Sequence, residues 1–82
     1  LKARNKVQLA NEAMSNPLAP PSERLVAAMV LTGWMSVRRL SCEVNIRRPR
    51  LQKILQAKVY PNYDEGRQIN DFFYTLNMPK VI

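Results

Sequence analysis

The chain has 82 residues, with 13 Lys and Arg against 6 Asp and Glu, and so a formal net charge of +7. It holds one cysteine and no histidine, which excludes a disulfide framework, a zinc finger and a histidine-dependent catalytic triad. Its longest apolar run, residues 25–31, is too short to span a membrane, and no signal-peptide pattern is present. We therefore expect one small cytoplasmic domain with no enzymatic activity, cofactor or metal. The first residue is Leu1 rather than Met, as expected of a processed product or of a piece of a longer chain.

Residues 1–21 predict a short helix or arm followed by a linker. Val7, Ala10 and Met14 recur at helical spacing. This pattern stops at Asn16. Prolines at positions 17, 20 and 21 then stiffen the chain, because each ring fixes φ and removes a backbone donor.

The next helix is predicted to run from Ser22 to about residue 32. Ser22 is a favoured N-cap residue, and Glu23 in the first turn suits the helix dipole. Gly33 is placed to end the helix in a left-handed cap. We expect the two residues that follow, Trp34 and Met35, to pack back against the core.

Two short helices are predicted in close succession after this point. Ser36 is the start signal of the first, and apolar residues then recur at helical steps up to Val44. Asn45 predicts a left-handed turn, because asparagine is one of the few residues other than glycine that tolerate a positive φ. Pro49 then fits the first turn of the second helix, whose apolar edge lies at positions 51, 54 and 55.

The last helix follows a loop over residues 58–63. Asp64 caps or leads this helix, and the pattern stops near Asn77. Its apolar face consists of Ile69, Phe72, Phe73 and Leu76. No segment of useful length shows the period-two alternation of a half-buried strand. The fold class predicted by these elements is all-α, a compact domain of four or five helices.

Positive charge is concentrated in residues 36–58, which carry seven basic residues and the single acid Glu43, and so a net charge of +6. Concentrated positive charge is typical of a protein with a polyanionic partner, usually nucleic acid, because phosphate neutralisation releases counterions. An acidic membrane surface, or a basic face that serves solubility alone, remains open at this point.

The same segment has the spacing of a helix-turn-helix motif. In a 20-residue unit that begins at Val37, the position where the two helices cross carries the small Ser41, and the turn position carries Asn45. The five positions expected to be buried are all aliphatic: Leu40, Val44, Ile46, Leu51 and Ile54.

Over about residues 22–76 the chain resembles the lambda-repressor-like, or Xre/Cro-type, helix-turn-helix domains. The strongest stretch runs without a gap from Met35 through Asn45 to Pro61. Val37 stands where many relatives carry a glutamine that braces the DNA backbone, and Ala57 replaces the usual glycine. The resemblance implies that residues 22–82 form a helix-turn-helix DNA-binding domain.

The resemblance also assigns roles to individual side chains. It implies that the second helix of the motif presents a groove-facing set, Arg47, Arg48, Pro49, Gln52 and Lys53, to the bases. Arg48 is the first candidate for base reading, because its guanidinium can bond guanine O6 and N7 together. Contacts to DNA phosphates are expected from Ser36, Arg38, Arg39, Arg50 and Lys58.

Two further features leave alternatives open. The basic residues Lys2, Arg4 and Lys6 form either an arm that follows the DNA or part of a segment that packs on the domain or on a partner subunit. The carboxyl-terminal apolar residues, Phe73, Tyr74, Met78, Val81 and Ile82, belong either to the core or to a dimerisation surface. Cys42 is expected to be an inert thiol, buried or half-buried.

These observations favour a sequence-specific regulator of transcription that binds double-stranded DNA, most simply a phage, plasmid or bacterial repressor that occludes a promoter. It would act as a homodimer, with a second DNA-binding segment, or as a monomer. Two alternatives are an antitoxin that autoregulates its own operon and the DNA-targeting domain of a recombination or replication factor. No membrane or small-molecule partner is expected.

Overall fold

The computed structural model describes residues 5–82, and within that span it contains five helices and no strand. In chain order these are α1 (Lys6–Ser15), α2 (Pro21–Thr32), α3 (Val37–Val44), α4 (Arg48–Leu55) and α5 (Tyr63–Tyr74). The prediction of an all-α domain of four or five helices is confirmed. No helix in the described part of the chain is long and apolar enough to cross a membrane.

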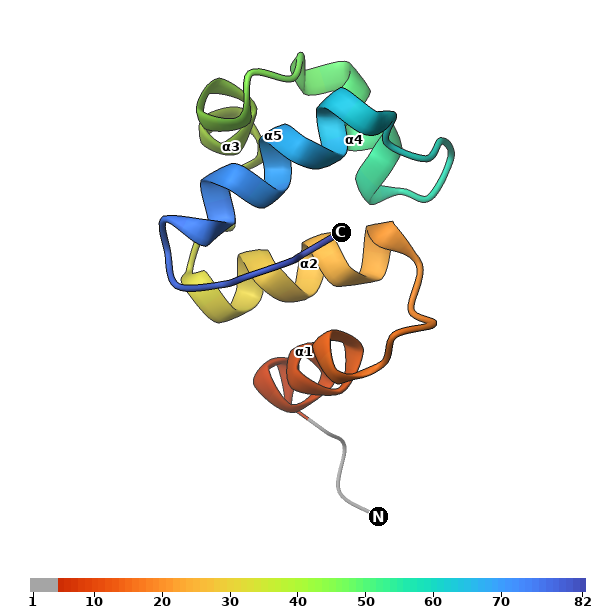
Figure 1. Ribbon diagram of the computed structural model, residues 1–82, viewed down its shortest axis with the longest axis vertical. Coiled ribbons are helices and arrows are strands. Elements are labelled where there is room, and N and C mark those ends of the chain that lie inside the picture. The colour runs from red at the N-terminus through yellow and green to blue at the C-terminus, as the bar shows by residue number, and fades with distance from the viewer. Residues whose placement is uncertain (1–4) are drawn as a thin grey trace.

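Helix α2 lies at the centre of the molecule. In Figure 1, α1 packs along one side of α2, while α3, α4 and α5 lie on the other side. The segment after α5 turns back and runs along α2 to the carboxyl terminus. Both ends of the described chain are therefore placed against the same helix.

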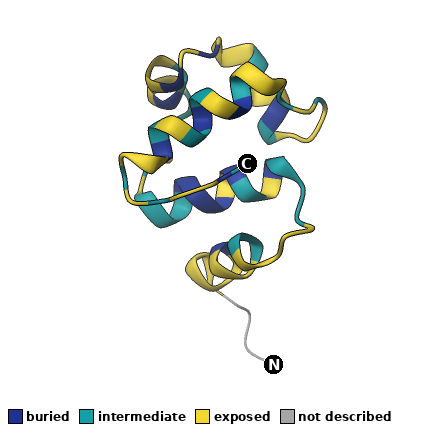
Figure 2. Cartoon of the chain, viewed as in Figure 1, coloured by how far each residue is buried: buried dark blue, intermediate teal, exposed yellow. Residues whose placement is uncertain are grey.

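The core forms where α2 meets α3, α4 and α5. Its buried members are Leu25, Ala28, Met29, Leu40, Val44, Ile46, Leu51, Ile54, Ile69, Phe73 and Val81. Figure 2 shows this burial as dark bands on the inward sides of the helices, with exposed residues on the outward sides. The five aliphatic positions predicted to be buried are at most 5% exposed, so that prediction is confirmed.

The helix starts confirm the predicted cap at Ser36 and correct the one at Ser22. Ser36 is the N-cap of α3, where its side chain accepts a hydrogen bond from the backbone N–H of Arg39. The prediction that Ser22 is the N-cap of α2 is wrong. That helix begins at Pro21 after Pro20, and Ser22 is buried inside its first turn. Proline suits this start because its φ is preset for a helix and it has no N–H that needs a cap.

Helix α5 begins earlier than its sequence pattern predicts. Its N-cap is Asn62, whose side chain accepts from the backbone N–H of Glu65, while the Glu65 carboxylate accepts from the backbone N–H of Asn62. This reciprocal capping box satisfies two otherwise orphaned donors. Asp64 therefore lies within the first turn and does not cap the helix.

Left-handed backbone appears at both predicted positions. Gly33 ends α2 at φ 78°, and Asn45 ends α3 at φ 57°. Ala57 also has a positive φ, of 61°, at the position where the resembled family usually carries glycine. The loop after α4 therefore keeps a glycine-like backbone at the cost of a Cβ in a crowded conformation.

The carboxyl-terminal apolar residues belong mainly to the core. Phe73 and Val81 are fully buried, and Met78 and Ile82 pack against the core from its edge. The backbone of Ile82 is held by the Asn70 side chain, which donates to its carbonyl and accepts from its N–H at 2.9 and 2.7 Å. Packing in or against the core is thus the role of these four residues, whereas Tyr74 is 69% exposed and lies outside the core.

Arg24 joins three separate segments of the chain. Its guanidinium, on α2, lies between the end of α1 and the carboxyl-terminal segment. It donates to the backbone carbonyls of Ala13, Met14, Asn16, Lys80 and Val81, at 2.7 to 3.4 Å. Arg24 is therefore a structural cation, a role that its sequence position did not indicate.

Replacing Arg24 by methionine should lower the free energy of unfolding by about 2 to 4 kcal/mol, because carbonyls at the end of α1 and in the carboxyl-terminal segment lose a donor that ties both segments to α2. Urea denaturation followed by far-UV circular dichroism measures this change. Arg67→Met is the matched control, since Arg67 is 60% exposed and forms only a 3.9 Å contact with Asp64. Equal losses in the two variants would contradict the structural role of Arg24.

Candidate nucleic-acid interface

The turn between α3 and α4 fixes the orientation of the candidate site. At Asn45 the backbone reverses through the left-handed region, with φ 57° and ψ 42°. The next N–H, that of Ile46, donates to the carbonyl of Ser41 at 3.2 Å, and the Ile46 side chain is buried. The turn is therefore anchored both by the backbone and by the core.

Helix α4 buries one side and exposes the other. Leu51 and Ile54 are fully buried. The residues predicted to read bases are all exposed: Arg47, Arg48, Pro49, Gln52 and Lys53. The last four recur at spacings of three and four, which places them on one face of a helix. We call these five residues the α4 face.

A second group of polar side chains lies at the start of α3. Ser36, Arg38 and Arg39 are exposed there, and Lys58 is exposed just after α4. The first backbone N–H groups of a helix lack intrahelical partners and favour anions. The structure thus places four of the five residues predicted to contact phosphate on exposed surface of α3 or of the loop that follows α4.

An aromatic pair supports Arg39, a role that the sequence did not reveal. The Arg39 guanidinium lies 5.1 Å from the centre of the Trp34 ring, within the range of a cation–π contact. Trp34 in turn packs edge-on against Phe72, with ring centres 5.0 Å apart. The expectation that Trp34 packs back on the domain is confirmed. Met35 is 55% exposed, so the same expectation is wrong for Met35.

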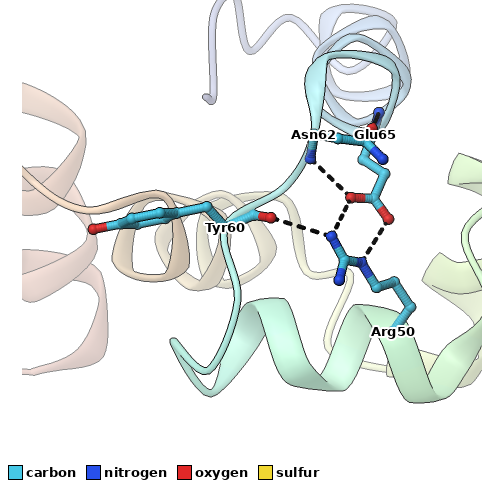
Figure 3. Close-up of polar contacts among 4 residues, drawn as sticks. All are labelled: Arg50, Tyr60, Asn62 and Glu65. Carbon is cyan, nitrogen blue, oxygen red and sulfur yellow. Dashed lines mark hydrogen bonds and ion pairs between the residues drawn. The ribbon is translucent and has the colours of Figure 1, made fainter.

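Arg50 differs from the other basic residues of this segment. Figure 3 shows its guanidinium paired with the Glu65 carboxylate through two hydrogen bonds, of 2.9 and 3.0 Å. It also donates to the carbonyl of Tyr60 at 3.2 Å. Arg50 therefore ties α4 to the start of α5 and points away from the α4 face. Its predicted phosphate contact would have to compete with these bonds.

The same pair sets the charge state of Glu65. Hydrogen bonds from Arg50 lower the pKa of the Glu65 carboxyl, and the backbone N–H of Asn62 lowers it further. Burial of the carboxyl opposes both effects, since its side chain is 12% exposed. Glu65 is thus held as an anion that both caps α5 and fixes Arg50.

Other predicted residues lie away from the α4 face. Lys2 and Arg4 lie outside the described residues. Lys6 is exposed at the start of α1, which packs on α2. Cys42 is exposed on α3, so the expectation of a buried or half-buried thiol is wrong, because α3 turns only Leu40 and Val44 fully inward.

Exposed tyrosines beside α4 were also missed by sequence reasoning. Tyr60 and Tyr63, in and after the loop that follows α4, are 75% and 84% exposed. Their hydroxyls can donate to phosphate oxygens. The aromatic residues on either side of Pro61 were the available signal.

Within residues 5–82 no group of three or more His, Cys, Asp or Glu is placed to hold a metal ion.

Comparison with known proteins finds no relative of this chain. No protein-family model matches the chain, and no match is found among curated proteins or solved structures. The function is therefore argued from the geometry and charge of the site itself.

Glu65→Gln should make the free energy of unfolding vary less with pH in the acidic range. The folded state lowers the Glu65 pKa below its ordinary value of 4.5. Its stabilising effect is therefore complete above that value and is lost as pH falls through the folded-state pKa. We expect Glu65→Gln to be less stable than the parent at pH 7, with a difference that shrinks below about pH 4.5.

Thermal unfolding between pH 2.5 and pH 7 measures this effect. Asp64→Asn is the matched control, because Asp64 lies in the same helical turn with its side chain 76% exposed. A constant difference between Glu65→Gln and the parent over the whole pH range would contradict the role given to Glu65.

Proposed function

We propose that this chain is a sequence-specific double-stranded DNA-binding domain of a transcriptional regulator, with α4 as the recognition helix of a helix-turn-helix. The observation that carries the proposal is the α4 face, where four polar side chains and Pro49 lie exposed on a helix that is anchored by its opposite side. An α-helix of this kind fits the major groove of B-DNA.

The side chains that read bases lie along α4, and the first of them stands at its beginning. Arg48 is its first residue and is exposed, and a planar guanidinium can donate to O6 and N7 of one guanine. Gln52 and Lys53 lie one turn further along and reach the following base pairs. Pro49 has no side-chain donor and contributes apolar contact, for example with a thymine methyl group.

Phosphate contacts fall to the start of α3 and to the loop after α4. Arg38, Arg39 and Lys58 supply charge, and Ser36 supplies a hydroxyl. Such contacts set the affinity and the register of a complex without reading sequence. The Trp34 ring limits the freedom of Arg39, which reduces the entropy lost when Arg39 binds a phosphate.

Regulation by such a domain needs no catalysis. A protein bound across promoter elements excludes the polymerase sterically, so we propose a repressor of phage, plasmid or bacterial type. The resemblance to lambda-repressor-like domains supports this reading at the level of fold, together with the αL turn at Asn45 and the five buried aliphatic positions.

Selection from a random duplex library at about 0.15 M salt tests the proposal. Enrichment of a short motif supports sequence-specific binding. Retention of duplex DNA without enrichment of any motif would show that residues 36–58 bind DNA only by non-specific electrostatic attraction. That result would overturn the proposal. Binding to the selected duplex can then be followed by the fluorescence of Trp34, the single tryptophan of the chain.

Arg48→Ala should weaken binding to the selected site by about 1 to 3 kcal/mol more than binding to random duplex. The reason is that loss of a bidentate contact removes discrimination as well as affinity. Titration of both duplexes, monitored by fluorescence anisotropy of labelled DNA, measures the difference. Arg67→Ala, on the exposed side of α5, is the control. An equal loss on both duplexes would make Arg48 a phosphate contact.

Arg39→Ala should weaken binding to both duplexes by similar factors. Because one phosphate contact is lost, the slope of log K against log salt should become less steep by about one unit. Titrations at four or more salt concentrations give that slope. An unchanged slope would show that Arg39 does not neutralise a phosphate.

A further inference from the structure

Arg50 lies beside the residues proposed to contact DNA. It stands on α4 three residues before Lys53, so the two side chains leave neighbouring positions of the helix. Its guanidinium reaches across to the loop after α4, where it donates to the backbone carbonyl of Tyr60 at 3.2 Å (Figure 3). Lys58, a candidate phosphate contact, is exposed in the same loop. Arg50 is therefore a cation between two groups of candidate DNA contacts.

Glu65 uses both of its carboxylate oxygens to hold this cation. Nε and Nη2 of Arg50 donate to Oε2 and Oε1 of Glu65 at 2.9 and 3.0 Å. Charge-assisted pairs with two parallel bonds are strong and fixed in geometry. The Glu65 side chain is only 12% exposed, so release of Arg50 would leave a largely buried carboxylate without its countercharge. That cost opposes the transfer of Arg50 from Glu65 to a phosphate.

This pairing distinguishes Arg50 from the other basic residues of the segment 36–58. Within the described part of the chain, the ion pairs are Arg50 with Glu65 and Arg67 with Asp64. Arg50 is thus the one basic residue of that segment whose charge is neutralised by an acid among residues 5–82. The acid comes from α5, outside the segment, and so it changes the charge that the segment presents.

We propose that Glu65 is a positioning residue that withholds Arg50 from the phosphates of a bound duplex. Glu65 makes no contact with DNA and acts through Arg50 alone. The domain then neutralises one phosphate fewer than its basic residues would allow. The proposal rests on the DNA-binding part of the proposed function and requires no sequence preference.

Glu65→Gln should therefore strengthen DNA binding. Glutamine keeps an oxygen that can accept from the backbone N–H of Asn62, so the capping box of α5 is retained. Its amide is neutral and has one oxygen in place of two, so a charged phosphate oxygen becomes the better acceptor for Arg50. One added phosphate contact should steepen the slope of log K against log salt by about one unit. At about 0.15 M salt it should strengthen binding about fivefold. The gain should be similar on selected and random duplex, because phosphates carry no sequence information.

Titration of the full chain against both labelled duplexes, by fluorescence anisotropy at four or more salt concentrations, tests the proposal. Asp64→Asn is the matched control, because it removes the same charge from the same helical turn, at a side chain that is 76% exposed and 3.9 Å from Arg67. It should leave the slope close to that of the parent. The double variant Arg50→Met with Glu65→Gln should also return the slope to the parent value, because the gained contact comes from Arg50.

Tighter binding separates this role from a purely structural one, since a variant that merely loses structure binds less DNA. An unchanged slope in Glu65→Gln, or a steeper slope that persists in the double variant or appears equally in Asp64→Asn, would overturn the proposal. A double variant whose slope falls one unit below that of the parent would also overturn it, because Arg50 would then already contact a phosphate in the parent.

The parent protein separates the two proposals. A parent that binds neither duplex would overturn the proposed function together with this inference. A parent that binds DNA, with a slope that Glu65→Gln leaves unchanged, would overturn this inference alone.

Discussion

The candidate interface depends on one backbone constraint, the left-handed turn at Asn45. A positive φ is costly for most residues, and asparagine reduces that cost. The turn directs Ile46 into the core and fixes the rotation of α4, with Leu51 and Ile54 inward. Because an α-helix has 3.6 residues per turn, this rotation also decides that Arg48, Gln52 and Lys53 face outward. The α4 face is therefore exposed because the opposite side of the helix is packed into the core.

Two arginines act inside the molecule instead of on its surface. Arg24 ties the end of α1 and the carboxyl-terminal segment to α2 by donating to their carbonyls, and Arg50 joins α4 to α5 through Glu65. A guanidinium suits both tasks because its donors form a rigid planar fork. A domain of this size has a small core, so polar links between segments carry a larger share of its organisation. The net charge therefore overstates the number of cations that are free to meet a polyanion.

The α4 face and the α1–α2 groove, which Leu9, Val26 and Met35 line, are different surfaces of one small fold. The α4 face and the start of α3 provide charge and donors, whereas the α1–α2 groove provides apolar area with one charge of each sign. A single recognition helix reads few base pairs, and pairing two of them raises specificity without new base contacts.

The sequence by itself determined the all-α class, the buried aliphatic positions and the local signals at Gly33, Ser36 and Asn45. These features depend on spacing along one helix or on the backbone preference of one residue, so short-range rules predict them. Tertiary structure decided the roles of Arg24, Arg50 and Trp34, because their partners lie 8 to 57 residues away, 15 residues away and in α5, respectively. It also decided the exposure of Met35 and Cys42, since burial depends on which elements pack nearby. The residue type shows what a side chain is able to bind. Only the packed fold shows whether that side chain is already bound to another part of the molecule.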